Sequence, residues 1–98
     1  MVDLGLAARI RPCLVLSVPL DESDRSLVTV VPHTTTLRQS RFEVAVLPRF
    51  LKLGAFDARG IVTVPTVRLM NRLGVLSTEQ LQTVEKGVCM WLGIKIAA

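Results

Sequence analysis

The chain has 98 residues, a hydrophobic fraction of 50%, a formal net charge of +4 and a pI of about 9.8. This length predicts one domain spanning residues 1–98 and excludes a second. The longest apolar stretch begins at Cys13 and is interrupted by Ser17 and Pro19, so it falls far short of the ~20 residues of a membrane helix.

Short β-branched runs separated by turn residues predict an antiparallel sheet. We expect a short strand remnant at the N-terminus, a turn at Gly5–Arg9 and a charged hairpin loop at Asp21–Arg25. The strand predictions are Met1–Leu4, Cys13–Val18, Leu27–Val31, Phe42–Val46, Ile61–Val64 and Leu73–Leu76, with one helical turn at Thr66–Met70.

The clearest local prediction is a C-terminal helix. Ser77 followed three residues later by Gln80 is a capping-box pattern, and Gly93 is a plausible C-terminal stop. Between them, apolar residues fall on one helical face, which we expect to be core: Leu81, Val84, Val88, Trp91 and Leu92. Several strands followed by one helix predict an α+β fold around a strongly bent antiparallel sheet.

Basic residues concentrate in the middle of the chain. Seven lie between residues 38 and 72, against two acidic residues, Glu43 and Asp57: Arg38, Arg41, Arg49, Lys52, Arg59, Arg68 and Arg72. Such an excess suits a polyanionic partner such as RNA, DNA or an acidic protein, and a solvated basic face is the alternative. The high hydrophobic fraction for so small a chain favours a homodimer that covers part of the apolar surface.

We expect a cytoplasmic protein with reduced thiols and no membrane association. No secretory signal pattern is visible in Met1–Ala8, and Cys13 and Cys89 lie far apart in apolar stretches. One histidine and two scattered cysteines do not have the spacing of a zinc site, so no metal and no cofactor are predicted.

Two neighbouring strands carry the most informative polar residues. Arg11-Pro12 opens the first apolar run, and the second run ends in Pro32-His33-Thr34-Thr35-Thr36. If the runs pair as a hairpin, the guanidinium and the hydroxyls fall at the same edge of the sheet. An arginine beside hydroxyl donors is a combination that binds phosphate.

These motifs resemble the MazF/PemK toxins of bacterial toxin–antitoxin pairs. The resemblance includes R-P-x-L-V-L-S at Arg11–Ser17, V-x-P-x-T-[ST] at residues 30–35 and G-x-L-S at Gly74–Ser77, and it extends from about Met1 to Ile94. It implies a small SH3-like barrel with a C-terminal helix. It also implies a metal-independent endoribonuclease that cleaves single-stranded RNA, works as a homodimer and is silenced by a cognate antitoxin.

The resemblance also implies roles for individual residues. Arg11 matches the catalytic arginine of the family, and Thr34 matches a threonine that donates a hydrogen bond to the phosphate. The residues expected to bind RNA are Arg9, Thr35, Arg38 and Arg41. The loops Leu37–Arg41 and Pro48–Ala55 are expected to contribute any base specificity.

Two departures from the family pattern leave the general base unidentified. The first strand looks truncated, and the loop before Arg11 has no carboxylate where many relatives carry a glutamate. His33 has an ordinary pKa near neutrality, but strand alternation places it opposite Thr34. We therefore expect His33 to be buried and structural.

Two other functions stay open at this point. Relatives of the same fold bind DNA gyrase without catalysis, and a degenerate member would dimerise and bind antitoxin without cutting RNA. The pairing of Arg11 with Thr34 favours the nuclease, because a protein that only binds needs no such pair.

Overall fold

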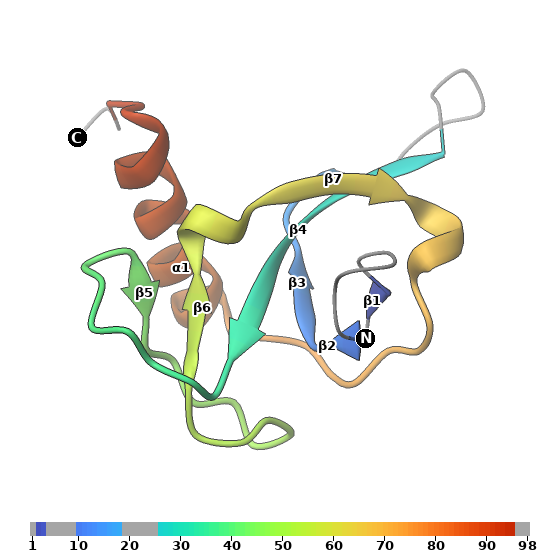
Figure 1. Cartoon of the computed structure of the whole chain (residues 1–98), viewed down its shortest axis with the longest axis horizontal. Coiled ribbons are helices and arrows are strands. Elements are labelled where there is room, and N and C mark those ends of the chain that lie inside the picture. The colour runs from blue at the N-terminus through green and yellow to red at the C-terminus, as the bar shows by residue number, and fades with distance from the viewer. Residues whose placement is uncertain (1, 4–9, 19–25, 96–98) are drawn as a thin grey trace.

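The computed structural model describes residues 2–3, 10–18 and 26–95, and shows a curled antiparallel half-barrel with one C-terminal helix (Figure 1). The fold class predicted from the sequence is thereby confirmed. The elements are β1 (Val2–Asp3), β2 (Ile10–Arg11), β3 (Cys13–Val15), β4 (Leu27–Thr34), β5 (Glu43–Val44), β6 (Ala55–Asp57), η1 (Ala58–Gly60), β7 (Val62–Pro65), η2 (Thr66–Arg68) and α1 (Thr78–Leu92).

The long strand β4 organises the main sheet, which has the order β3-β4-β6-β5 with β7 also paired to β4. Val30 of β4 pairs with Val15 of β3 on one side and with Val62 of β7 on the other. Further along β4, His33 pairs with Phe56 of β6. β6 therefore pairs with the C-terminal end of β4, whereas β7, which follows after the turn η1, pairs with its N-terminal half. This arrangement gives the sheet its curl. A separate two-stranded ladder pairs β1 with β2.

A proline lies inside this central strand, where a missing backbone donor would ordinarily break the ladder. The amide of His33 donates to the carbonyl oxygen of Pro12 at 2.8 Å, so the backbone amide of residue 33 points toward the β3 side of the strand. Alternation turns the nitrogen of Pro32 to the opposite side. There the pairing with β7 has ended at Val30 and the pairing with β6 has not begun. Pro32 therefore costs the sheet no hydrogen bond.

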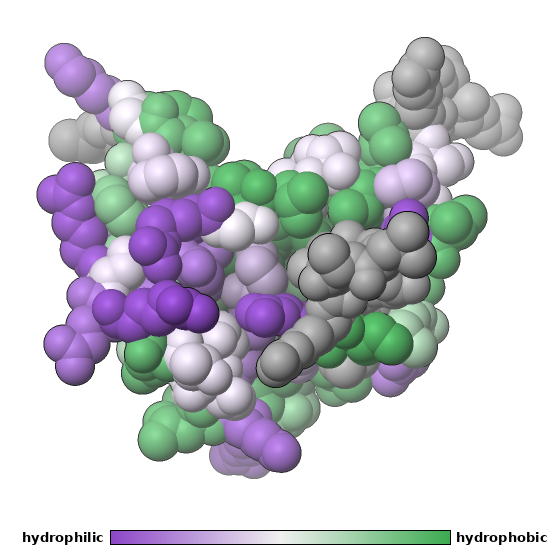
Figure 2. Space-filling view, viewed as in Figure 1, coloured by the Kyte–Doolittle hydropathy of each residue, from purple (hydrophilic) through white to green (hydrophobic). Residues whose placement is uncertain are grey.

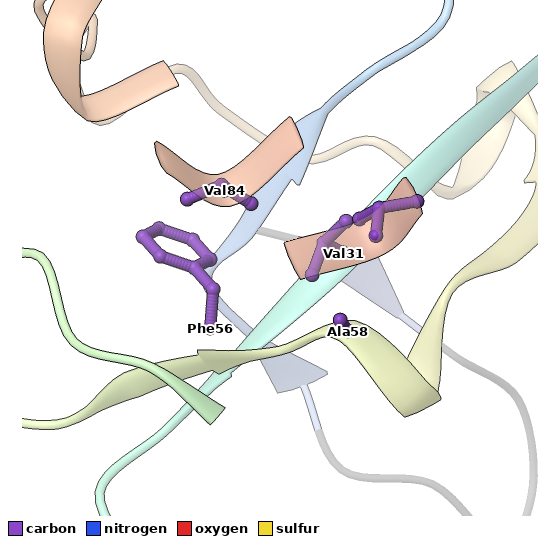
Figure 3. Packing of buried hydrophobic residues seen from close by; sticks show 5 residues of the cluster. Val31, Phe56, Ala58 and Val84 are labelled. Atoms are coloured by element: carbon purple, nitrogen blue, oxygen red, sulfur yellow. The ribbon is translucent and has the colours of Figure 1, made fainter. Parts of the chain in front are cut away.

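The core lies between the curled sheet and α1. Val31 from β4, Phe56 from β6, Ala58 from η1 and Val84 from α1 point toward one another (Figure 3). Val84 is 0% exposed, and Val88 completes this cluster. Burial of apolar side chains is the main stabilising term of such a fold.

The capping signals of α1 are formed as predicted. The Ser77 hydroxyl accepts from the amide of Gln80 at 3.1 Å, and the Gln80 side chain accepts from the amide of Ser77 at 3.0 Å. Gly93 ends the helix in the left-handed conformation with φ of 72°. The amide of Ile94 then donates to the carbonyl oxygen of Cys89 at 2.9 Å, as in a Schellman ending.

The predicted apolar face of α1 is only partly core. Val84 and Val88 are buried, whereas Trp91 is 42% and Leu92 50% exposed. Trp91 still makes an edge-to-face contact with Phe42, with ring centroids 5.0 Å apart. The last turn of the helix therefore extends past the edge of the core.

Five of the six predicted strand regions contain a strand, although the extents differ. β3 and β5 are shorter than predicted, and β4 continues three residues further than expected. The predicted strand at Leu73–Leu76 is wrong, because that segment forms no strand. β2 and β6 were missed, and the turn at Thr66–Met70 is the 3₁₀ turn η2. The predictions at Gly5–Arg9 and Asp21–Arg25 concern residues outside the described part.

Candidate functional site

A hollow of about 420 Å³ lies where β2 meets the end of β4. It brings together Arg11, Thr34 and Thr35, three of the residues that the sequence assigns to the site. The described residues that line it are Ile10, Arg11, Pro12, His33, Thr34, Thr35, Thr36, Phe50, Leu51, Lys52 and Leu73.

Arg11 reaches this hollow because of the pairing between β3 and β4. Cys13 lies opposite Pro32 in the ladder, and the Pro12 carbonyl accepts from the amide of His33 at 2.8 Å. Arg11 therefore lies beside the end of β4, and its side chain is half-buried. The hairpin geometry expected from the sequence is confirmed.

The hydroxyl of Thr34 is held by the turn that follows β4. Its oxygen accepts from the amide of Thr36 at 3.1 Å and lies 3.3 Å from the carbonyl oxygen of the same residue, to which it donates. The second bond is long, so the hydroxyl proton can rotate toward a ligand while the amide still holds the oxygen. Thr34 is thus positioned by the backbone and retains one available donor.

His33 is buried, with 3% of its surface exposed, as predicted. Its ring makes an edge-to-face contact with Phe56 at 5.1 Å, and its Nε2 has no hydrogen-bond partner among the described residues. Burial lowers the pKa of His33 below its ordinary value of 6.5. His33 nevertheless borders the same hollow as Thr34, so strand alternation does not keep it away from the site as the sequence suggested.

The segment from Pro48 to Gly54 contributes to the lining of the hollow. Phe50, Leu51 and Lys52 line it. Gly54 lies close to β4. A Cβ added at this position would overlap the carbonyl oxygen of Thr34 and lie 2.9 Å from Cε1 of His33. Only glycine allows this approach without displacement of the strand end.

Lys52 is the site residue that sequence reasoning did not assign. It counted toward the basic excess, and the loop that contains it was expected to contribute specificity. Its contribution to the hollow depends on how the loop folds against β4, and no local pattern predicts that fold. No described residue of the lining is acidic, so the hollow combines two cationic side chains with three threonine hydroxyls.

Two predicted RNA-binding residues lie elsewhere. Arg38 and Arg41 do not line this hollow, and Arg41 instead packs over the ring of Phe42 at 4.7 Å. Their loop is ordered by Glu43, whose carboxylate accepts from the amide of Arg38 at 2.9 Å and from that of Ser40 at 2.7 Å. Their RNA-binding role stays a prediction, and Arg9 lies outside the described residues.

A second, larger hollow of about 530 Å³ adjoins the first and shares Pro12, Phe50, Leu51 and Leu73 with it. Its lining is mostly apolar and comes from β3, the Pro48–Gly54 segment and residues 69–76, with Phe56 of β6 and Leu81 of α1. Cys13 contributes to this lining, and burial raises the pKa of its thiol to about 11. The thiol is therefore protonated near neutral pH and unsuited to nucleophilic attack.

On the face in Figure 2, strongly hydrophilic residues gather over the half that carries β5 and β6, while apolar residues are exposed in several other places.

Among the described residues, no group of three or more His, Cys, Asp and Glu side chains is arranged to hold a metal ion. In the same part of the chain, no helix is long and apolar enough to cross a membrane.

A family model described as "PemK-like, MazF-like toxin of type II toxin-antitoxin system" matches residues 3–92. The comparison with curated proteins found no match.

Among solved structures, the chain is similar to an endoribonuclease in complex with its cognate antitoxin from a mycobacterial species. The sequence identity is 26%, the TM-score 0.79, and the match covers 98% of this chain and 91% of that chain. The Mycobacterium tuberculosis toxin MazF-mt6 matches at 25% identity and a TM-score of 0.73, covering 88% of this chain and 89% of that chain. A MazE-MazF structure from Deinococcus radiodurans, at 23% identity and a TM-score of 0.74, covers 87% of both chains and shows the fold alone. The resemblance inferred from the motifs is confirmed, and the chain belongs to the family of PemK-like and MazF-like toxins of type II toxin-antitoxin systems.

Proposed function

We propose that this chain is a metal-independent endoribonuclease that cleaves single-stranded RNA in the cytoplasm and is inhibited by a cognate antitoxin. The observation that carries the proposal is the hollow in which Arg11, Thr34 and Thr35 converge without an acidic neighbour in its described lining. The similarity to an endoribonuclease solved with its cognate antitoxin supports both the activity and the partner.

Arg11 is proposed to stabilise the phosphoryl oxygens during cleavage. The 2′-hydroxyl of the substrate loses its proton and attacks the adjacent phosphorus, the bond from phosphorus to the 5′-oxygen breaks, and the 5′-oxygen takes up a proton. Negative charge grows meanwhile on the nonbridging oxygens. A guanidinium presents a planar pair of donors to two such oxygens and stays protonated throughout. Arg11 therefore acts as an electrostatic stabiliser rather than as the base.

Thr34 is proposed to donate to the same phosphate. The amide of Thr36 fixes the hydroxyl oxygen, so donation to the phosphate requires only that the proton leave the long 3.3 Å bond to the carbonyl oxygen of Thr36. A donor that is already in place loses little entropy on binding. Thr35, at the same strand end, is proposed to contact the adjoining part of the RNA backbone.

The test is cleavage of RNA by purified protein in EDTA, with analysis of the new ends. We expect a 2′,3′-cyclic phosphate on the upstream fragment and a 5′-hydroxyl on the downstream one. Arg11→Ala should lower the cleavage rate by about 10²–10³, as for loss of one oxyanion donor. Arg11→Lys should also be slow, because a point charge does not replace the planar fork.

Lys86→Gln is the matched control, because Lys86 is exposed on α1 and lines neither hollow. A strict requirement for Mg²⁺, or full activity of Arg11→Ala, would contradict the mechanism. A folded wild-type protein that binds antitoxin but cuts no RNA would instead identify a degenerate member.

We also propose a homodimer, because the hydrophobic fraction of 50% is high for so small a chain. The exposed apolar surface supports this proposal. The second hollow opens between β3 and residues 69–76, where Val15, Met70 and Val75 are exposed. Covering such side chains stabilises a dimer by about 25 cal/mol for each Å² removed from water. Sedimentation equilibrium at micromolar concentration should give twice the chain mass of 10.8 kDa.

A further inference from the structure

We infer that Lys52 is a second cationic contact to the RNA backbone, and that it contributes binding affinity rather than acceleration of the chemical step. The inference rests on the proposed function. Lys52 lines the hollow that holds Arg11 and Thr34, although it lies on a loop far from both in the sequence.

The loop holds Lys52 at this place by contacts on both sides. Before it, Pro48 is buried and its carbonyl accepts from the amide of Leu51 at 3.2 Å, which closes a turn. Leu51 is partly buried against the main core cluster. After it, Gly54 lies so close to β4 that a Cβ would overlap the carbonyl oxygen of Thr34. The backbone of Lys52 is therefore fixed relative to the hydroxyl of Thr34.

The charges of the hollow suit a polyanion. Arg11 and Lys52 are the two cationic side chains among its described lining residues, and none of those residues is acidic and could neutralise them. Without such a neighbour, a bound phosphate displaces only mobile counterions. Counterion release makes cationic contacts to single-stranded RNA depend on salt. The logarithm of the binding constant falls by about 0.7 per unit of log salt concentration for each phosphate neutralised.

The two cations differ in what they can do. Arg11 is a half-buried residue whose guanidinium is a rigid, planar fork, whereas Lys52 is an exposed residue whose ammonium is a hydrated point charge on a flexible stem. A mobile point charge stabilises bound RNA about equally before and during the reaction. Such uniform binding changes KM and leaves kcat nearly unchanged.

The experiment compares wild type, Lys52→Gln, Lys52→Arg and the control Lys86→Gln. A cut is first mapped with wild-type protein on a long single-stranded RNA. A fluorescent oligonucleotide spanning that cut, with a 2′-deoxy nucleotide on its 5′ side to prevent cleavage, then reports Kd over a range of salt concentrations. The unmodified oligonucleotide reports kcat and KM, and Trp91 fluorescence and circular dichroism check the fold.

We expect Lys52→Gln to raise Kd and KM about fivefold at low salt, equivalent to one charge-assisted contact. We also expect the salt slope to fall by about 0.7 while kcat stays within about twofold. Lys52→Arg should restore the slope, and Lys86→Gln should match wild type.

Two results would overturn the inference alone. Either wild type cuts the RNA while Lys52→Gln keeps the wild-type Kd and salt slope, or Lys52→Gln loses kcat by orders of magnitude with Kd unchanged. A wild-type protein that neither binds nor cuts RNA would overturn the proposed function, and this inference with it.

Discussion

Replacement of His33 by leucine is expected to stabilise the fold. His33 is 3% exposed, and its Nε2 has no hydrogen-bond partner among the described residues. A buried polar group without a partner costs about 1–3 kcal/mol. Leucine removes that cost and loses the edge-to-face contact with Phe56, which contributes about 0.5–1.5 kcal/mol. The net gain is about 1 kcal/mol, or about 4–8 °C in Tm for a chain of this size.

The same substitution should remove a pH dependence. Burial lowers the pKa of His33 below 6.5, so the unfolded chain binds a proton more readily than the folded one. The stability from neutral burial is therefore complete above pH 6.5 and decreases as the pH falls toward the lower pKa of the folded state. His33 is the chain's one histidine, so His33→Leu should lose most of this dependence between pH 7.5 and 5.

Urea denaturation followed by Trp91 fluorescence measures both effects, because Trp91 is the one tryptophan of the chain and contacts Phe42. RNA cleavage by the same variant tests whether His33 takes part in catalysis. A variant less stable than wild type, with an unchanged pH profile, would refute the reasoning about the buried Nε2. If the variant is stable but cleaves RNA orders of magnitude more slowly, His33 takes part in the activity and is not merely structural.

Two further substitutions test the supports of the site and of the helix. Gly54→Ala should destabilise the fold by about 1–3 kcal/mol, because the new Cβ overlaps the carbonyl oxygen of Thr34. It should also slow RNA cleavage by displacing the strand end; an unchanged urea midpoint would show that the loop moves without cost. Ser77→Ala removes the capping box of α1 and should cost about 1 kcal/mol in the same urea assay. Thr83→Ala on the exposed face of the helix serves as its control and should change the midpoint far less.

The elements that the sequence predicted well are those with local signals. The helix begins and ends where Ser77, Gln80 and Gly93 indicate, because capping bonds form between residues close in the chain. These local signals do not predict that Trp91 and Leu92 are exposed. Helical periodicity tells which residues share a face, but the edge of the core depends on how far the sheet extends beneath the helix.

The elements that were missed depend on contacts between distant residues. β6 is only three residues long, and its Phe56 is buried because it pairs with β4 and packs against α1. The segment Leu73–Leu76 has strand-like residues, yet it borders the second hollow and pairs with no strand. Lys52 was missed for the same reason, since its place depends on the fit of Gly54 against Thr34.

The geometry of the candidate site follows from the register of two strands. Cys13 lies opposite Pro32, and this register places Arg11 beside the end of β4. Val30 and Val31 are both 0% exposed and belong to separate core clusters, Val30 with Val28 and Val31 with Phe56, so packing on both faces holds β4 in place. Core packing therefore determines where Arg11 and Thr34 meet, although neither belongs to the core. For this reason, substitutions at Val30 or Val31 should weaken catalysis together with stability, whereas substitution of Lys52 should affect RNA binding alone.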